Sequence, residues 1–117
     1  MGNGSRYGSK YRNRKTDVDG ITFDSAREAR RYAELKLLER GGYISNLQLQ
    51  VPYELIPSQR NIDGKVVAKA VRYIADFVYT DRAGQTVVED AKGVLTDVYK
   101  LKKKLMLYVH NINVKEV

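Results

Sequence analysis

The chain has 117 residues, no cysteine and a single histidine, and its 21 lysines and arginines outnumber 14 acidic residues to give a formal net charge of +7. This length suits one domain, and such a charge favours polyanionic partners, nucleic acid first. The residue counts exclude disulfides, thiolate zinc sites and any site that needs two histidines. Any catalysis must therefore use carboxylates, lysines or hydroxyls.

Segments for membranes or secretion are not evident in the sequence. No apolar run approaches the roughly 18 residues that would span a bilayer, and the N-terminus lacks the apolar stretch of a secretory signal. We therefore expect a cytoplasmic protein.

Residues 1–19 are rich in glycine, serine and basic residues and show no apolar periodicity. We predict a flexible basic arm here, followed by one folded domain over residues 20–117. The mixture of cations and tyrosine rings suits phosphates and unpaired bases, although a merely solubilising tail is the alternative. The arm residues expected to bind DNA are Arg6, Lys10, Arg12, Arg14 and Lys15.

The next segment, DSAREARRYAELKLLERGG, predicts a helix that is capped by Ser25 and stops at Gly41 and Gly42. Glu28 lies three residues after the cap, where it fits a capping box. It also borders the apolar stripe, from which its carboxylate could lean over a sheet, and the sequence leaves both roles open. The predicted apolar face consists of Ala26, Ala29, Tyr32, Ala33 and Leu37.

Three strands are predicted after this helix. Apolar residues alternate over 47–55, which indicates a half-buried strand, and 57–64 is predicted to be a loop or an elongated turn. The β-formers of 66–80 and of 85–92 predict a second and a third strand in an antiparallel meander.

The connection Asp81-Arg82-Ala83-Gly84 sets the pairing of the last two strands. Asp at the first position and Gly at the fourth are typical of a type I turn closed by a glycine bulge. This three-residue loop places Asp81 opposite Gln85, and counting back places Asp76 opposite Asp90. A four-residue loop would instead bring Glu89 opposite Asp76.

In the favoured register, Asp76, Asp90 and Lys92 project from one face of the hairpin. Two carboxylates so close repel by roughly 4 kcal/mol at an effective dielectric near 20, and a cation between them relieves that repulsion. Mg²⁺ is typically held by one or two carboxylates, and the lysine could reach an attacking water or a phosphate oxygen. The hairpin therefore predicts a divalent-metal site with a lysine beside it, with a simple cross-strand salt bridge as the alternative.

After Gly93, the sequence predicts an amphipathic helix over about 96–110 and a short closing strand over 111–114. The predicted apolar stripe of this helix consists of Val98, Leu101, Leu105, Tyr108 and Val109. Outside the stripe lie further candidates for DNA contact, Tyr99, Lys100 and Lys103, although a solvated face is the commoner role of a lysine run. The order helix, three strands, helix, strand predicts an α/β (α+β) fold with a mixed central sheet.

These residues carry a resemblance to the PD-(D/E)xK nuclease superfamily, whose restriction-endonuclease-like core has the order α-β-β-β-α-β. More narrowly, the chain is similar to small phage-encoded proteins of the Holliday-junction-resolvase or endodeoxyribonuclease type. The matching segments, which span nearly the whole chain, are KYRNRKT, DGITFDSAREARRY, GGYISNLQLQVPYEL, YIADFVY, VVEDAKG, and Tyr99 with Lys103. One departure is Ala75, which stands where the superfamily name has proline.

The resemblance implies a Mg²⁺-dependent DNA endonuclease, with Mn²⁺ as an alternative ion, that acts on branched or recombination-intermediate DNA in the cytoplasm of a phage's bacterial host. It implies that Asp76 and Asp90 bind the metal, that Lys92 orients the water, and that the Ala91 carbonyl and Glu28 complete the metal shell. A homodimer would suit the cutting of symmetric junctions, and the sequence singles out no interface for one.

Two other functions compete with this interpretation. A non-catalytic nucleic-acid-binding protein would carry the acidic hairpin as a structural element and would cleave no substrate. A nuclease with an RNase-H-like acidic cluster would use carboxylates without the lysine, so that loss of Lys92 would be nearly harmless.

Overall fold

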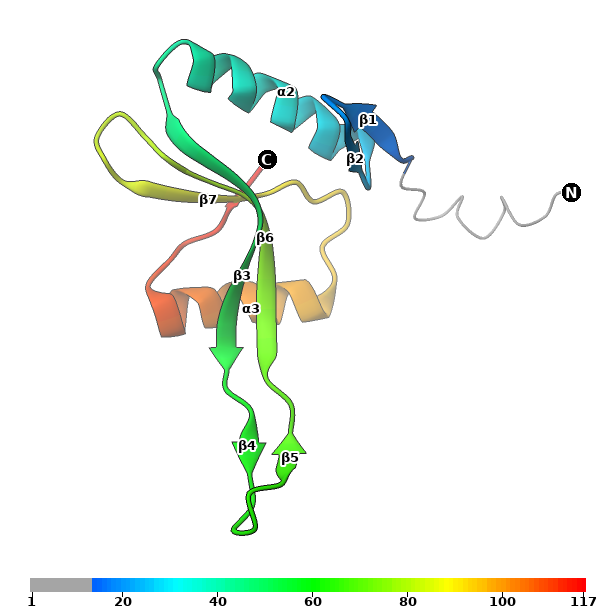
Figure 1. The fold of residues 1–117 in the computed structure, drawn as a ribbon, viewed down its shortest axis with the longest axis vertical. Coiled ribbons are helices and arrows are strands. Elements are labelled where there is room, and N and C mark those ends of the chain that lie inside the picture. The colour runs from blue at the N-terminus through cyan, green and yellow to red at the C-terminus, as the bar shows by residue number, and fades with distance from the viewer. Residues whose placement is uncertain (1–13) are drawn as a thin grey trace, which may run out of the picture.

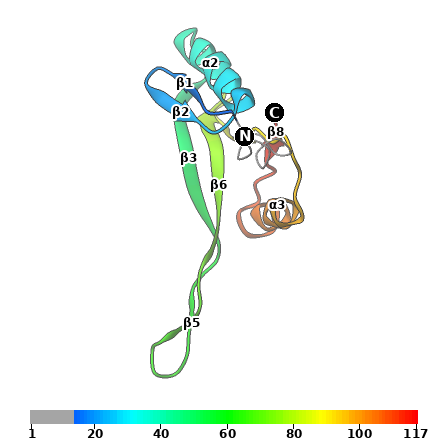
Figure 2. The same cartoon turned by 90° about the vertical axis from the view of Figure 1, so that its right-hand side faces the viewer.

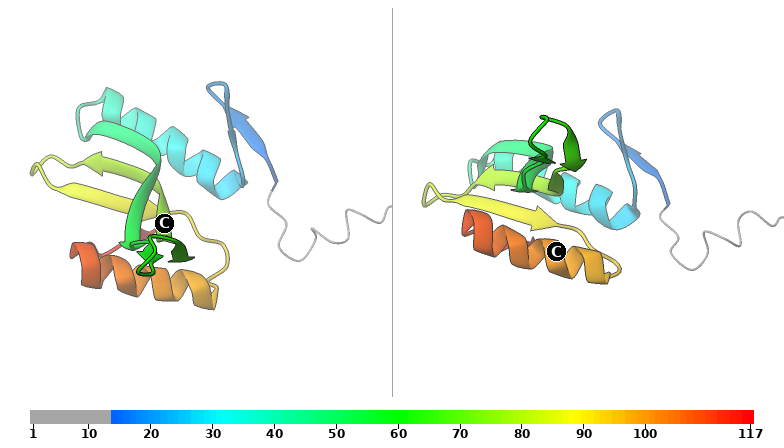
Figure 3. Two further views of the ribbon diagram at one scale, coloured as in Figure 1. Left: turned by 60° about the horizontal axis from the view of Figure 1, so that its bottom comes forward. Right: turned by 90° about the horizontal axis from the view of Figure 1, so that it is seen from below.

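The computed structural model describes residues 14–117. Its centre is a four-stranded sheet with one helix on each face, α2 (Ala26–Arg40) and α3 (Asp97–His110) (Figures 1 and 3). Neither helix is long and apolar enough to cross a membrane, within this described part of the chain.

The sheet has the strand order β3-β6-β7-β8. Strands β3 (Ser45–Ile56), β6 (Val71–Thr80) and β7 (Thr86–Asp90) form the predicted antiparallel meander, and β8 (Lys115–Glu116) pairs parallel to β7. The prediction of an α+β fold with a mixed sheet is confirmed.

The closing strand, however, lies later than the predicted 111–114. Asn111 ends α3 in the left-handed conformation (φ 56°), and its backbone N–H bonds back to the last turn of the helix. Val114 is buried in the core, so pairing with β7 begins only at Lys115.

Helix α2 is preceded by a small hairpin that was not predicted from the sequence. Strands β1 (Thr16–Val18) and β2 (Ile21–Phe23) pair across Asp19 and Gly20, both with positive φ, as a type I′ turn requires. The Tyr32 hydroxyl donates to the Asp19 carboxylate (3.1 Å) and ties this hairpin to α2. The fold therefore begins inside the segment 1–19 that was expected to be an arm.

The turn between β6 and β7 has the predicted form. The Asp81 N–H donates to the Gln85 carbonyl (2.9 Å), the Gly84 N–H donates to the Asp81 carbonyl (3.0 Å), and Gly84 has φ 84°. Phe77 pairs with Glu89, so Asp76 and Asp90 are the next facing positions. The register that places Asp90, and not Glu89, beside Asp76 is thereby confirmed.

The second predicted strand, 66–80, is broken into β5 (Val66–Ala68) and β6. Strand β5 pairs with β4 (Gln59–Arg60), which lies within the segment 57–64 predicted to be a loop or an elongated turn. These two short strands continue the β3–β6 ribbon into an arm that extends beyond α3 and the rest of the body (Figures 1 and 2). Every residue from 56 to 67 is exposed, so the arm adds nothing to the core.

Helix α2 begins and ends as predicted but buries a different face. The Ser25 side chain accepts from the Glu28 N–H (3.1 Å), and the chain turns at Gly42 (φ 81°). Leu35 is fully buried, whereas Ala33 and Leu37 of the predicted stripe are exposed. The face that packs on the sheet comprises Glu28, Ala29, Tyr32 and Leu35. The rotation brings Glu28 to the inner side.

Helix α3 has the predicted extent, with Thr96 as its cap, but its predicted apolar stripe is wrong. Tyr99 and Met106 are its buried residues, whereas Val98, Leu101 and Tyr108 are exposed, Tyr108 by 85%. The face that packs on the sheet lies between the predicted apolar stripe and the lysines. The predicted stripe itself is therefore left as an exposed apolar face.

Two apolar clusters lie on opposite faces of the sheet. The first joins α3 to the end of β3 through residues such as Met106 and Leu55, and the second joins α2 to the start of β3 through residues such as Leu35 and Leu47. Strand β3 passes from one cluster to the other at Gln50, which has φ 53°. This crossing lies beside Asp76.

Candidate metal and nuclease site

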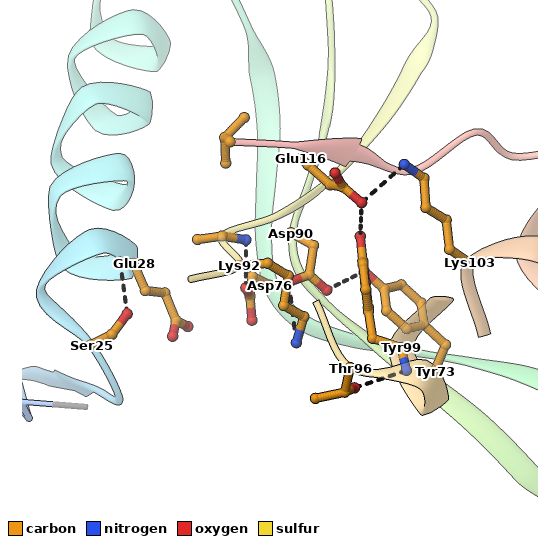
Figure 4. Close-up of polar contacts among 12 residues, drawn as sticks. Ser25, Glu28, Tyr73, Asp76, Asp90, Lys92, Thr96, Tyr99, Lys103 and Glu116 are labelled. Atoms are coloured by element: carbon orange, nitrogen blue, oxygen red, sulfur yellow. Dashed lines mark hydrogen bonds and ion pairs between the residues drawn. The ribbon is translucent and has the colours of Figure 1, made fainter. Parts of the chain in front are cut away.

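The predicted site residues come together at the crossing (Figure 4). Asp76 comes from the middle of β6, Asp90 from the last position of β7, and Lys92 from the segment that follows β7. Glu28 comes from the first turn of α2 and points toward the other three. Three secondary-structure elements therefore converge on one small polar region.

Asp90 is a buried carboxylate with one oxygen that accepts no hydrogen bond in the described part of the chain. The residue is 1% exposed, and its Oδ2 accepts a hydrogen bond from the Tyr73 hydroxyl. Burial and this hydrogen bond raise the pKa of Tyr73, which keeps the hydroxyl a donor. Oδ1 is buried without any hydrogen-bond partner among the residues that the structure describes. An ionised oxygen in that position needs a cation, since burial without one is costly.

The Lys92 ammonium supplies part of that positive charge. Its Nζ lies 3.4 Å from Asp90 Oδ1 and 4.9 Å from the centre of the Tyr99 ring. The side chain is about one-third exposed, so the amine remains accessible from solvent while the aromatic face holds it near the carboxylate.

Both carboxylate oxygens of Asp76 accept a hydrogen bond. Oδ2 accepts from the backbone N–H of Ala91 (2.9 Å), and Oδ1 accepts from the Gln50 amide (3.2 Å). Burial, followed by repulsion from Asp90, raises the pKa of Asp76 to about 6 in spite of these bonds. Negative charge is therefore in excess at this point of the protein.

The Glu28 side chain takes the second of the two positions that the sequence left open, over the sheet. Its carboxylate accepts from Gln50 Nε2 (3.0 Å), whereas the Ser25 cap is bonded only through the Glu28 backbone N–H. The residue is 7% exposed, and burial, then repulsion from Asp76, raises the pKa of Glu28 to about 7.

Gln50 is the site residue that sequence reasoning missed. Its amide nitrogen bridges Glu28 and Asp76, so a neutral donor holds two carboxylates at a fixed separation. A left-handed backbone is uncommon for a residue other than glycine, and such residues cluster at functional sites. A usable signal was the polar Gln50 in the strand register opposite Asp76.

The donor atoms of these residues are of the type that binds a hard divalent cation. Asp76, Asp90 and Glu28 carry only oxygen donors, the kind that Mg²⁺ prefers, and Asp90 Oδ1 faces only the Lys92 ammonium among the described residues. Within residues 14–117, however, no three acidic or histidine side chains lie close enough together to hold one metal ion between them. Water and phosphate oxygens commonly complete a Mg²⁺ shell that only one or two carboxylates begin, so the arrangement remains compatible with that ion.

Glu89, the rejected alternative to Asp90, points to the other face of the sheet. It is fully buried and receives two hydrogen bonds from the Arg31 guanidinium (2.8 and 2.7 Å) and one from the Tyr79 hydroxyl. These donors lower the pKa of Glu89 against the opposing effect of burial. Glu89 therefore joins α2 to the sheet and is not part of the site.

The predicted DNA contacts of α3 divide into two kinds. Lys100 is exposed and available to a ligand. Tyr99 is only 5% exposed, and its hydroxyl donates to Glu116 (2.9 Å), which also binds the Lys103 ammonium (3.0 Å). Because its ring is buried behind Lys92, Tyr99 forms a wall of the site and is not placed to stack on a base.

Only part of the predicted basic arm can be located. Arg6, Lys10 and Arg12 lie outside the described residues. Arg14 is exposed, and Lys15 forms an exposed ion pair with Asp24 (3.4 Å), one residue before the cap of α2. The start of the described chain thus lies near the end of α2 that carries Glu28.

A pocket of about 250 Å³ adjoins the site. Its walls come from β2, from the start of α2 and from β3, and they include Phe23, Asp24, Glu28 and Gln50. The Glu28 carboxylate is therefore accessible from a concave surface.

Comparison with known proteins places the chain in a family without assigning it a function. Neither a curated protein nor a solved structure matches it. A family profile matches residues 8–116, which is nearly the whole chain. The chain therefore belongs to the family described as "Protein of unknown function (DUF1064)".

Proposed function

We propose that this protein is a Mg²⁺-dependent DNA endonuclease that hydrolyses phosphodiester bonds. The observation that carries the proposal is the buried Asp90 Oδ1, which faces the Lys92 ammonium at 3.4 Å, accepts no hydrogen bond from residues 14–117 and lies close enough to Asp76 to raise the pKa of that carboxylate. The buried Glu89 carboxylate on the other face differs, because each of its oxygens accepts a hydrogen bond from the Arg31 guanidinium.

In this proposal each side chain has a separate task. Asp76 and Asp90 bind the metal, with Glu28 and the Ala91 carbonyl as further ligands. Bound Mg²⁺, or Mn²⁺ in its place, supplies positive charge to the scissile phosphate and to the leaving oxygen. Lys92 orients the attacking water and accompanies the negative charge that develops on the phosphate.

The charge of the protein supports DNA as the substrate. The net charge of +7 promotes binding to a phosphate backbone; Lys100 is exposed on α3 next to Tyr99, and Arg14 is exposed just before β1. Branched or recombination-intermediate DNA in a phage-infected bacterial cytoplasm is the substrate and setting that the resemblance to resolvases favours.

The uncovered face of α3 supports a homodimer, which would let two sites cut a symmetric junction. Val98, Leu101 and Tyr108 are each more than half exposed on this helix, and exposed apolar faces commonly mark interfaces. Leu101→Lys should convert a dimer to a monomer in light scattering, whereas a wild-type protein that is already monomeric would contradict the dimer.

Cleavage assays test the proposal directly. Linear, flapped, four-way and single-stranded DNA are incubated with the protein in Mg²⁺, in Mn²⁺ and in EDTA. Asp90→Asn should lower the rate more than about 100-fold, because even groups behind a metal ligand contribute about 10- to 100-fold. Glu54→Gln, which removes an exposed carboxylate of β3 away from the site, is the matched control.

The result that would refute the proposal is wild-type protein that binds DNA but cleaves none of these substrates in either metal. That outcome would favour the non-catalytic nucleic-acid-binding protein, whose affinity should simply fall steeply as salt rises.

A further inference from the structure

The arm formed by β4 and β5 contributes no buried residue to the folded body that residues 14–117 form. Residues 56–67 are all exposed, and an isolated two-stranded hairpin is at best marginally stable in water. Figures 1 and 2 show the arm extending past α3 from the end of the β3–β6 ribbon. Such a projecting element is placed to contact a partner outside the folded body.

The tip of the arm is nevertheless tightly built. The Asn61 side-chain oxygen accepts from the backbone N–H groups of Asp63 (2.9 Å) and Lys65 (3.0 Å), and the Asn61 N–H donates to the Lys65 carbonyl (2.9 Å). Gly64 has φ 82°, and its carbonyl accepts from Arg60 Nη1 (2.7 Å). This is the same turn that joins β6 to β7, used a second time.

What this turn presents is an isoleucine. Ile62 stands at the first central position of the turn and is 100% exposed. The corresponding residue of the other turn, Arg82, instead covers the Tyr43 ring (4.7 Å). A rigid turn that holds a fully exposed β-branched side chain outward is suited to insertion into an apolar environment.

The flanks of the arm are basic. Residues 57–72 contain four cations, all exposed, and the single acid Asp63, which leaves a net charge of +3. The cations are Arg60, Lys65, Lys69 and Arg72. Such a charge opposes contact with a second copy of this basic chain and favours a polyanion.

The distance from the tip of the arm to the candidate site is comparable to one turn of a DNA duplex. Gly64 lies 12 residues before Asp76 in the sequence, and at about 3.3 Å per residue the tip is at most about 40 Å from the site. One turn of B-DNA is about 34 Å long. A duplex lying along the ribbon could therefore contact both ends of it.

We propose that the tip of this arm is a duplex-DNA contact in which Ile62 inserts between base pairs from the minor groove while the basic flanks bind the phosphates on either side. Apolar side chains inserted in this way unstack one step and bend the helix. The inference rests on the proposed function for its partner, DNA, but not on metal binding or cleavage.

The test measures binding and base unstacking in EDTA, so that no cleavage takes place. The full chain is titrated against linear and four-way DNA that carries 2-aminopurine, whose fluorescence rises when its stack opens. Ile62→Asp should abolish the fluorescence rise and weaken binding about 10-fold or more, whereas Ile62→Leu should retain both. Val67→Thr, which changes an exposed valine on the same arm but not at its tip, is the matched control.

A second variant tests the flanks. Lys69→Glu should weaken binding at every sequence and reduce the dependence of affinity on salt, while leaving the fluorescence rise at saturation unchanged. Circular dichroism of each variant verifies that the fold is intact.

The inference is overturned if Ile62→Asp binds and unstacks DNA as the wild type does, or if the substitution changes only the oligomeric state. It survives a failure of the proposed function, because wild-type protein that unstacks DNA without cleaving it in Mg²⁺ would refute the nuclease alone. Conversely, if the wild type cleaves DNA and Ile62→Asp binds and unstacks DNA as the wild type does, only the arm contact is refuted.

Discussion

Replacing Glu28 by glutamine should stabilise the metal-free protein at alkaline pH. The side chain is 7% exposed, and burial together with Asp76 raises its pKa from 4.5 to about 7. This raised pKa means that the free energy of unfolding of the wild type is about 3 kcal/mol lower at pH 8, where Glu28 is ionised, than at a pH where Glu28 is protonated in both states. Glutamine is neutral, keeps an oxygen that can accept from Gln50, and leaves the backbone cap intact.

The sign of the pH dependence follows from the direction of the shift. Because the folded pKa is raised, the wild type should lose stability as pH rises from about 4.5 to about 7 and should change little through this group outside that window. The advantage of Glu28→Gln should therefore be near zero at pH 4 and largest at pH 8.

Urea unfolding in EDTA, followed by far-ultraviolet circular dichroism at pH 4, 6 and 8, measures both quantities. Glu54→Gln, at an exposed position, should stay within about 0.5 kcal/mol of the wild type throughout. Added Mg²⁺ should narrow the gap at pH 8, since a cation relieves the same repulsion. If Glu28→Gln is less stable than the wild type at pH 8, burial and the neighbouring carboxylates do not penalise the ionised Glu28 as described.

Two further predictions concern the two faces of the sheet. Lys92→Ala should reduce DNA cleavage by more than about 100-fold while DNA affinity changes little, and near-normal cleavage would favour a carboxylate-only nuclease. Arg31→Met should destabilise the fold by about 3 kcal/mol, because it leaves the fully buried Glu89 without its guanidinium partner, and a urea midpoint equal to that of the wild type would contradict this role.

The sequence was sufficient to predict the register of the functional hairpin because that register depends on local turn chemistry. Asp81 and Gly84 specify a turn that closes within four residues, and the positions of Asp76 and Asp90 follow by counting. The segment 57–64 was predicted only as a loop or an elongated turn, because Pro57 and the polar residues around it give no strand pattern, so the tight turn at Asn61 to Gly64 and its flanking strands did not follow from it.

The buried faces of the two helices were predicted less well than the hairpin register. Each helix carries more than one possible apolar stripe, and packing against the sheet decides which of them is buried. In α2 the ion pair of Arg31 with Glu89 and the burial of Leu35 rotate the helix away from Ala33 and Leu37. In α3 the docking of Tyr99 against Tyr73 and Glu116 has the same effect. Both outcomes depend on contacts between residues far apart in the chain.

The role of Gln50 could not be derived from periodicity. Alternation from Leu47 to Leu55 correctly indicated a half-buried strand, but it could not show that the strand changes the helix against which it packs at its midpoint. That change depends on the left-handed conformation at Gln50, which pattern analysis does not register.

The crossing at Gln50 ties the separation of the Glu28 and Asp76 carboxylates to the conformation of a single strand residue. One half of β3 packs with α2 and the other half packs with α3, and the Gln50 amide bonds to both carboxylates where the two halves meet. A change in the left-handed backbone at residue 50 would therefore alter the spacing of two acidic groups without replacing either of them.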